Sequence, residues 1–172
     1  MKRNKHIGTF GTVIHGTMRE EDLIPAFASE LRSLARKGTK HKALALEAER
    51  YLKRFQSADV TLTKKPSSIF TDTYKNAPSE EELNELVTEL MDALNEYAPA
   101  YGYFGAHPGD GSDYGFWLSE SFEEDFDGLK VSDTSEVPRG YKGELAQVSD
   151  HGNVTLLVAN GRGKFREVWG LV

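Results

Sequence analysis

The sequence predicts a single α+β domain in which helices pack on one face of a mostly antiparallel sheet. Three segments before Pro99 carry apolar residues at the three- and four-residue spacing of amphipathic helices. After Pro99 the pattern changes to short β-like runs separated by glycine, asparagine and aspartate. Early helices followed by antiparallel strands are typical of the α+β class. The chain of 172 residues has the size of one domain, which we expect to span residues 1–172.

The N-terminal part of the chain is expected to form a short strand followed by a helix. The β-branched pair at 13–14 lies between glycines, which is typical of a strand. A helix is expected over about residues 19–37, with a capping box in TMRE (17–20) and a left-handed end at Gly38. Pro25 lies beyond the first turn and predicts a kink or a later start.

Two further helices are expected in the next segment. Residues 40–56 carry an apolar stripe at helical spacing, and residues 58–63 (ADVTLT) are compatible with a short strand. Residues 79–97 carry the clearest helical pattern, which starts with a capping box in SEEE (79–82) and stops before Pro99. The expected core of the protein comprises Leu31, Leu44, Leu86, Leu90, Phe116, Leu156 and Trp169.

The C-terminal half is expected to consist mostly of strands. Residues 101–106 and 114–118 are predicted to pair as a hairpin, and the acidic segment 119–128 is predicted to form a helical turn. The last strands are expected to form a meander through ELAQVS (144–149), VTLLVA (154–159) and FREVWGLV (165–172). Asn160–Gly161 favours a tight turn before the last strand, because both residues accept positive φ.

The composition excludes several classes of protein. The chain has no cysteine, which excludes a disulfide scaffold, a thiolate zinc site and a cysteine nucleophile. No apolar run approaches the roughly 20 residues of a membrane helix, and the basic N-terminus lacks the apolar core of a signal peptide. We therefore expect a soluble cytoplasmic protein.

The charge is unevenly distributed along the chain. Residues 1–65 carry a net charge of +7 and the remaining residues carry −13, which together give −6. Such asymmetry can mark an interaction surface, but solvated helix faces or attraction between the two halves explain it more simply. A basic cluster surrounds the first helix–helix junction: Arg32, Arg36, Lys37, Lys40 and Lys42. Because the whole chain is acidic and carries no nucleic-acid motif, we expect no nucleic-acid partner.

The stretch YGYFGAHPGDGSDYGFW (101–117) is the most unusual in the sequence. Its aromatic residues fall on both faces of the expected hairpin, which predicts a hairpin covered on both sides or a binding surface on one side. In the connecting HPGDGSD (107–113), glycine, proline and aspartate are all turn formers. We therefore predict a rigid, solvent-facing turn over residues 107–113, which leaves His107 and Asp113 without an explanation.

Chemical roles for this stretch are alternatives to the turn. Two aspartates and His107, joined by His15 from the N-terminal strand, are candidate ligands of a divalent cation, although no EF-hand or HExxH pattern is present. His15 also precedes a helix start near Arg19, which makes it a candidate general base beside an anion-attracting helix end. Glycine amides as phosphate donors are disfavoured by the two aspartates. The candidate binding residues are His15, Arg19, Tyr103, His107, Asp110 and Asp113.

Three segments resemble a family of small uncharacterised bacterial and phage-borne proteins. These segments are HGTMREEDLIPAFASEL, YFGAHPGDGSDYGFW and the C-terminal GNVTLLVANGRGKFREVWGLV, so the resemblance covers most of the chain except its middle. The family brings no activity with it. The resemblance implies an accessory protein of a mobile element that binds a host protein.

Two functions remain open from the sequence. The first is a non-enzymatic accessory protein that needs no cofactor and binds a protein partner, because neither a GxSxG elbow nor a nucleotide-binding motif is present. The second is a small metal-dependent hydrolase that uses His15, His107, Asp110 and Asp113. Whether the chain is an enzyme is not decided by its motifs.

Overall fold

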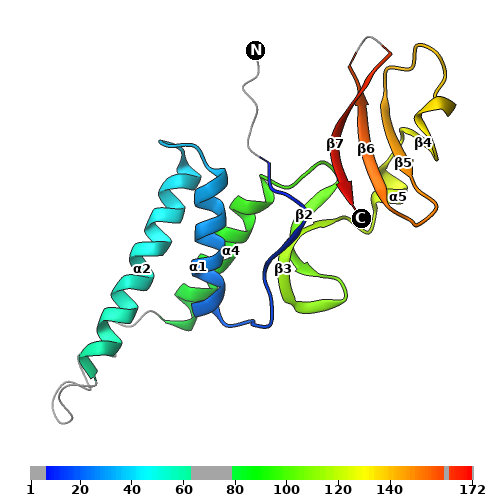
Figure 1. Cartoon of the computed structure of the whole chain (residues 1–172). Helices are drawn as coiled ribbons and strands as arrows, with labels where there is room; N and C mark the ends of the chain where they lie inside the picture. Colours follow the sequence, from blue (N-terminus) through cyan, green and yellow to red (C-terminus); the bar gives the residue numbers. More distant parts are fainter. Residues whose placement is uncertain (1–6, 63–78, 161–162, 172) are drawn as a thin grey trace. The chain divides into compact units, whose positions relative to one another are not determined.

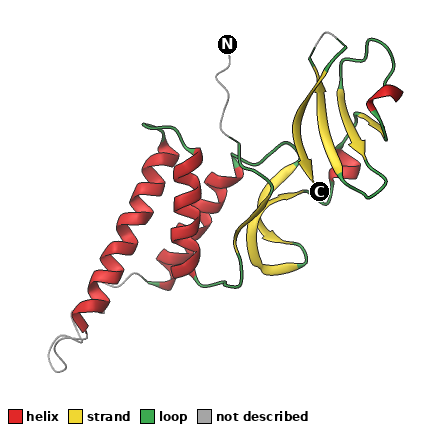
Figure 2. Ribbon diagram, viewed as in Figure 1, coloured by secondary structure: helices red, strands yellow, loops and turns green. Residues whose placement is uncertain are grey.

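The computed structural model describes residues 7–62, 79–160 and 163–171 (Figure 1). It confirms the α+β class, with helices in the first part of the chain and mostly antiparallel strands after them (Figure 2). The strands form two sheets, one of three strands and one of four, whereas the sequence did not separate them. No helix in these ranges has both the length and the apolar character that crossing a bilayer requires.

The chain divides into two compact units. The first unit comprises Met1–Ala98 and Tyr103–Trp117, and the second comprises Pro99–Gly102 and Leu118–Val172. Each unit has buried apolar residues of its own. The expectation of one domain over residues 1–172 stays a prediction.

Three helices form the larger part of the first unit. They are α1 (Glu20–Leu34), α2 (Lys40–Leu62) and α4 (Glu80–Asn95), and α1 packs against both of the others (Figure 1). Their apolar stripes meet in one core, as the helical spacing predicts. Because α1 is the shared neighbour, it is the structural centre of this unit.

The three-stranded sheet completes the first unit. Its strands are β1 (Gly11–Ile14), β2 (Gly102–His107) and β3 (Asp110–Leu118), in the order β1-β3-β2. β1 runs antiparallel to β3, with a register irregularity between Thr12 and Ile14. β1 is therefore an edge strand of this sheet.

Aromatic rings join the sheet to α1. The ring of Phe27 lies edge-on to that of Phe104, with their centroids 5.1 Å apart, and its centroid is 5.6 Å from that of the Tyr114 ring. The centroids of the Phe104 and Phe116 rings are 4.9 Å apart. Fully burying such a side chain stabilises a fold by roughly 1.5–3 kcal/mol. Of the expected core, Leu31, Leu90 and Phe116 are buried here, whereas Leu44 and Leu86 are only partly buried.

The start of α1 differs from the expected capping box. Arg19 is the N-cap residue, and its side chain makes no cap hydrogen bond. The Thr17 hydroxyl accepts a hydrogen bond from the Arg19 N–H (3.1 Å) and donates one to Asp22 (2.8 Å). The capping box predicted in residues 17–20 is wrong, because the chain enters the helix two residues later than the motif requires.

The middle and the end of α1 also correct the prediction. The helix contains Pro25 and begins before it, so the later start is wrong. It ends at Leu34, where the Ala35 N–H donates to the Leu31 carbonyl at 2.8 Å. Gly38 has the expected positive φ of 83° but lies in the loop after the helix rather than at its cap.

The other two helices match the sequence in different degrees. α4 starts with the predicted capping box, in which Ser79 and Glu82 satisfy each other's backbone N–H groups. α2 continues to Leu62, so a strand in residues 58–62 is wrong, and residue 63 lies outside the described residues. No glycine or proline interrupts this extension, and each added helical residue gains one hydrogen bond.

The hairpin between β2 and β3 has a shorter turn than predicted. β2 continues to His107 and β3 begins at Asp110, so only Pro108 and Gly109 form the turn. The predicted turn over 107–113 is therefore too long. Strand pairing extends through residues that are common in turns, and Asp110 accepts a hydrogen bond from the Ser112 N–H within the same strand (2.9 Å).

The second unit contains the predicted meander. β5 (Glu144–Val148), β6 (Val154–Ala159) and β7 (Phe165–Leu171) pair in antiparallel order. β4 (Leu129–Val131), which the sequence did not predict, adds a parallel strand next to β5. The acidic segment contains the expected helical turn as α5 (Phe122–Asp125), and the turn at Asn160–Gly161 lies partly outside the described residues.

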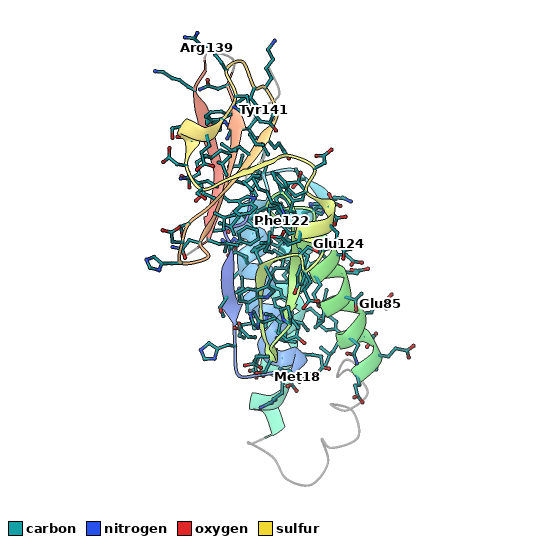
Figure 3. All side chains as sticks on the ribbon, turned by 90° about the vertical axis from the view of Figure 1, so that its right-hand side faces the viewer. Met18, Glu85, Phe122, Glu124, Arg139 and Tyr141 are labelled. Carbon is teal, nitrogen blue, oxygen red and sulfur yellow. The ribbon has the colours of Figure 1, made fainter. Side chains whose placement is uncertain are left out.

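Aromatic residues also hold the second unit together. Leu156 and Trp169 are buried as predicted, and the Trp169 indole donates to the Ala100 carbonyl oxygen at 2.9 Å. The Tyr141 hydroxyl donates to the backbone carbonyl of Glu144 at 2.7 Å (Figure 3). A short 3-10 helix, Thr134–Glu136, lies between β4 and β5 in the sequence.

Candidate functional site

The structure brings three of the predicted site residues to one end of the three-stranded sheet. The Gly16 N–H donates to the Ser112 carbonyl at 3.0 Å, which holds the segment after β1 beside the start of β3. Hydrogen bonds from the Ser112 backbone and side chain lower the pKa of Asp110, and the nearby His107 and His15 lower it further. His15, His107 and Asp110 are therefore neighbours.

Local bonds explain His107 and one carboxylate oxygen of Asp113 structurally. The ring of His107 packs edge-on against that of Trp117, and its Nδ1 accepts the Gly109 N–H at 3.0 Å. Asp113 accepts a hydrogen bond from the Thr12 hydroxyl at 3.2 Å and so joins β3 to β1. Its other oxygen is buried and has no hydrogen-bond partner in the described part of the chain.

Arg19 and Tyr103 have contacts of their own. Arg19 is exposed and pairs with Glu21 at 3.0 Å, while the Tyr103 hydroxyl donates to the Ala106 carbonyl at 3.1 Å. Among residues 7–62, 79–160 and 163–171, no group of three or more histidine, aspartate or glutamate side chains is arranged to hold a metal ion. The predicted metal site therefore has no set of ligands in these ranges.

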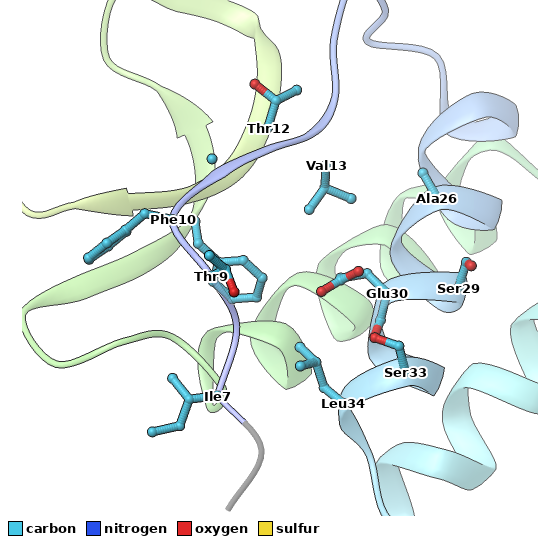
Figure 4. Close-up of a pocket in the computed structure, with 12 residues that line it drawn as sticks. Ile7, Thr9, Phe10, Thr12, Val13, Ala26, Ser29, Glu30, Ser33 and Leu34 are labelled. Carbon is cyan, nitrogen blue, oxygen red and sulfur yellow. The ribbon is translucent and has the colours of Figure 1, made fainter. Parts of the chain in front are cut away.

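A groove between β1 and α1 is a second candidate, which the sequence did not indicate. It has a volume of about 640 Å³, and β1 forms one wall while α1 forms the other (Figure 4). Apolar and polar side chains both line it, and Ile7, with 53% of its surface exposed, lies at this site. The described lining residues are Ile7, Thr9, Phe10, Gly11, Thr12, Val13, Ala26, Ser29, Glu30, Ser33, Leu34 and Phe116.

The helical repeat determines which side of α1 faces this groove. Ala26, Ser29, Glu30 and Ser33 follow one another at spacings of three, one and three residues, which places them on one side of a helix. The core stripe of the helix lies beside them. In the sequence, the groove side of α1 appears only as small and hydroxyl residues around one glutamate. Such a pattern does not indicate a site, because it is also common on solvated helix faces.

Glu30 is the ionisable residue among the described residues of the groove. Burial raises the pKa of its carboxyl group, since a low-dielectric environment disfavours the charged form. Within the described residues its carboxylate makes no hydrogen bond and no ion pair, whereas its backbone carbonyl accepts a hydrogen bond from the Ser33 hydroxyl at 2.8 Å. Arg32, two positions along α1, is already bound to Glu49 of α2 at 2.9 Å.

No family model matches this chain, and no curated protein or solved structure is detectably similar to it. The resemblance to small bacterial and phage-borne proteins therefore stays a prediction.

Proposed function

We propose that this chain is a non-enzymatic protein-binding module that holds an extended segment of a partner protein in the groove between β1 and α1. The observation that carries this proposal is the position of β1, an edge strand that lies opposite a helix across an open groove. An edge strand presents unpaired backbone N–H and C=O groups, and an extended segment can pair with them. The opposite helix supplies side chains that recognise the segment.

The length of β1 limits what can bind. The strand has four residues and contains a register irregularity between Thr12 and Ile14. Short edge strands and bulges oppose continuous sheet-to-sheet pairing. The occupant is therefore a short segment rather than another sheet.

The lining chemistry supports a peptide segment with apolar and basic side chains. Val13 and Leu34 offer apolar contacts, and Ile7 adds an exposed apolar side chain to the lining of the same groove. Glu30 gives the groove negative charge without a cation of its own among the described residues. Opposite charge on the partner favours encounter and correct orientation.

The cellular setting belongs to the same proposal. A module without cofactor that binds a host protein fits an accessory role in a phage or mobile element, which the resemblance of the hairpin and C-terminal segments suggests. The absence of cysteine supports a reducing compartment such as the cytoplasm. We propose no nucleic-acid partner.

Selection from a random peptide library against the full chain tests this function. The recovered peptides are expected to protect backbone amides of residues 9–13 from hydrogen exchange. Methylation of alternate backbone nitrogens in a peptide should abolish binding, because it removes donors to β1. The control is a matched peptide that is methylated on the remaining, alternate backbone nitrogens. These nitrogens point away from β1, so their methylation should leave binding intact.

Three outcomes would contradict the proposal. The first is a library that yields no binder, and the second is a set of binders that protect other amides and tolerate both methylation patterns. The third is a dimer in sedimentation experiments in which the same amides are protected without any peptide, because a second copy would then occupy the groove.

A further inference from the structure

We infer that Glu30, with Ser29 and Ser33, forms a specificity pocket on α1 that selects an arginine side chain of the bound segment. This inference rests on the proposed function, since it names the side chain that the segment must carry. It assigns a recognition role to three residues that no sequence motif marks.

The position of Glu30 is the first support. Its side chain extends from α1 into the groove that β1 lines on the other side (Figure 4). Ser29 and Ser33 also line the groove. A side chain that projects from a segment paired with β1 toward α1 would therefore meet these three residues.

The unpaired state of Glu30 is the second support. Its carboxylate has no partner within the described residues, although it is half-buried. A ligand in the groove would bury this charge further, and burying an uncompensated carboxylate is strongly unfavourable. A cationic side chain on the ligand offsets that cost, whereas a neutral one does not.

The two serines favour arginine over lysine. The Ser33 hydroxyl hydrogen is directed to the Glu30 carbonyl, which leaves the lone pairs of its oxygen free to accept a bond. Ser29 is exposed and lies four residues before Ser33, one turn away on α1. A guanidinium group has five donors in a planar fork and can bind a carboxylate with two bonds while a third reaches a hydroxyl. A lysine ammonium lacks this fork.

Other cations on this part of the chain do not replace the ligand. Arg32 binds Glu49 through two oxygens, at 2.9 and 3.1 Å. Arg19 is paired with Glu21 at the start of α1. The charge on Glu30 is thus left for a group that comes from outside the described residues.

Peptides recovered from the library provide the test. Each is synthesised with arginine, lysine or citrulline at the enriched basic position, because citrulline keeps the shape of arginine without its charge. We expect affinity to fall roughly tenfold to a hundredfold from arginine to citrulline, with lysine in between. Glu30→Gln should remove most of this preference, whereas Glu85→Gln, an exposed carboxylate on α4 (Figure 3), should leave it unchanged.

A charge exchange makes the pairing specific. Glu30→Lys should bind a peptide with glutamate at that position better than the arginine peptide, and Ser33→Ala should narrow the gap between arginine and lysine without abolishing binding. Circular dichroism and thermal melts verify that each variant folds. These variants separate direct recognition from a merely structural role of Glu30.

The outcomes distinguish this inference from the proposed function. If arginine, lysine and citrulline peptides bind equally while backbone methylation still abolishes binding, the arginine pocket is wrong and the strand-addition function stands. If Glu30→Gln lowered the affinity of all three peptides by the same factor, the arginine pocket would also be wrong. If methylation has no effect and residues 9–13 gain no protection, the function itself fails.

Discussion

The imidazole ring of His107 packs edge-on against the indole ring of Trp117, with their centroids 4.7 Å apart. The Trp117 indole N–H also donates to the Gly105 carbonyl oxygen at 2.9 Å, so the tryptophan joins β3 to β2. Trp117 is half-buried rather than fully buried, and the residue at the hairpin tip is its partner. The pair is thus a small stabilising unit of the hairpin.

Replacing each member of this pair should therefore destabilise the protein to a different degree. Trp117→Ala is expected to cost about 2–3 kcal/mol, which is less than for a fully buried ring, because part of the indole faces solvent. His107→Ala is expected to cost about 1 kcal/mol through the lost aromatic contact. Urea unfolding of both variants measures this. Equal losses would show that His107 has a further role.

Divalent metal should leave the stability of the protein unchanged. No group of three suitable ligands exists within the described ranges, and a ligand raises the melting temperature only if it binds the native state. Thermal melts with added zinc or magnesium test this, with Asp110→Asn as the comparison. A rise for the wild type that is lost in Asp110→Asn would restore the metal-dependent hydrolase.

Glu30→Gln should slightly stabilise the free protein at neutral pH. Because burial raises the pKa of Glu30, the folded state holds its proton more tightly, and stability decreases as the pH rises from the unfolded toward the folded pKa. The gain should be about 0.5 kcal/mol or less, since the group is partly solvated. Urea unfolding at several pH values checks this, and a variant less stable than the wild type would contradict it.

Tyr101→Phe should reduce stability at neutral pH. The Tyr101 hydroxyl donates to the Glu144 carboxylate at 2.5 Å, and this bond is the main cause that raises the pKa of Tyr101 from 10.0 to about 12. The expected loss is about 1 kcal/mol, reduced by partial solvent exposure. A raised folded pKa means that this stability is present below about 10 and disappears as the pH rises through about 12. Phenolate absorbance during an alkaline titration measures the pKa of Tyr101. Ionisation at the ordinary tyrosine pKa would contradict this prediction.

The two helix starts provide a matched comparison. Ser79→Ala removes an observed cap and should cost about 1 kcal/mol. Thr17→Ala should cost less, about 0.5 kcal/mol, because its hydroxyl bonds the Arg19 N–H and Asp22 but caps no helix. Thermal melts of both variants measure the difference. A larger loss for Thr17→Ala would contradict a start of α1 at Arg19 without a side-chain cap.

The sequence by itself determined the features that depend on neighbouring residues. The stripe of α4 and its Ser79 cap, the strands of the meander and the helical turn near Phe122 all follow from periodicity and turn chemistry within short windows. The sequence also indicated that the loop around His107 is largely structural, although it overestimated the length of the turn, because turn-forming residues can also continue a strand.

Only the tertiary structure decided which strands are neighbours and which surfaces stay open. The parallel pairing of β4 with β5, the separation into two sheets and the edge position of β1 depend on contacts between distant residues. Strand pairing depends on packing across the sheet rather than on local pattern, so no window around Gly11–Ile14 shows that one side of this strand is free. Glu30 looks like any solvated helix residue in the sequence. It becomes a candidate recognition residue because the fold places a free strand edge opposite it.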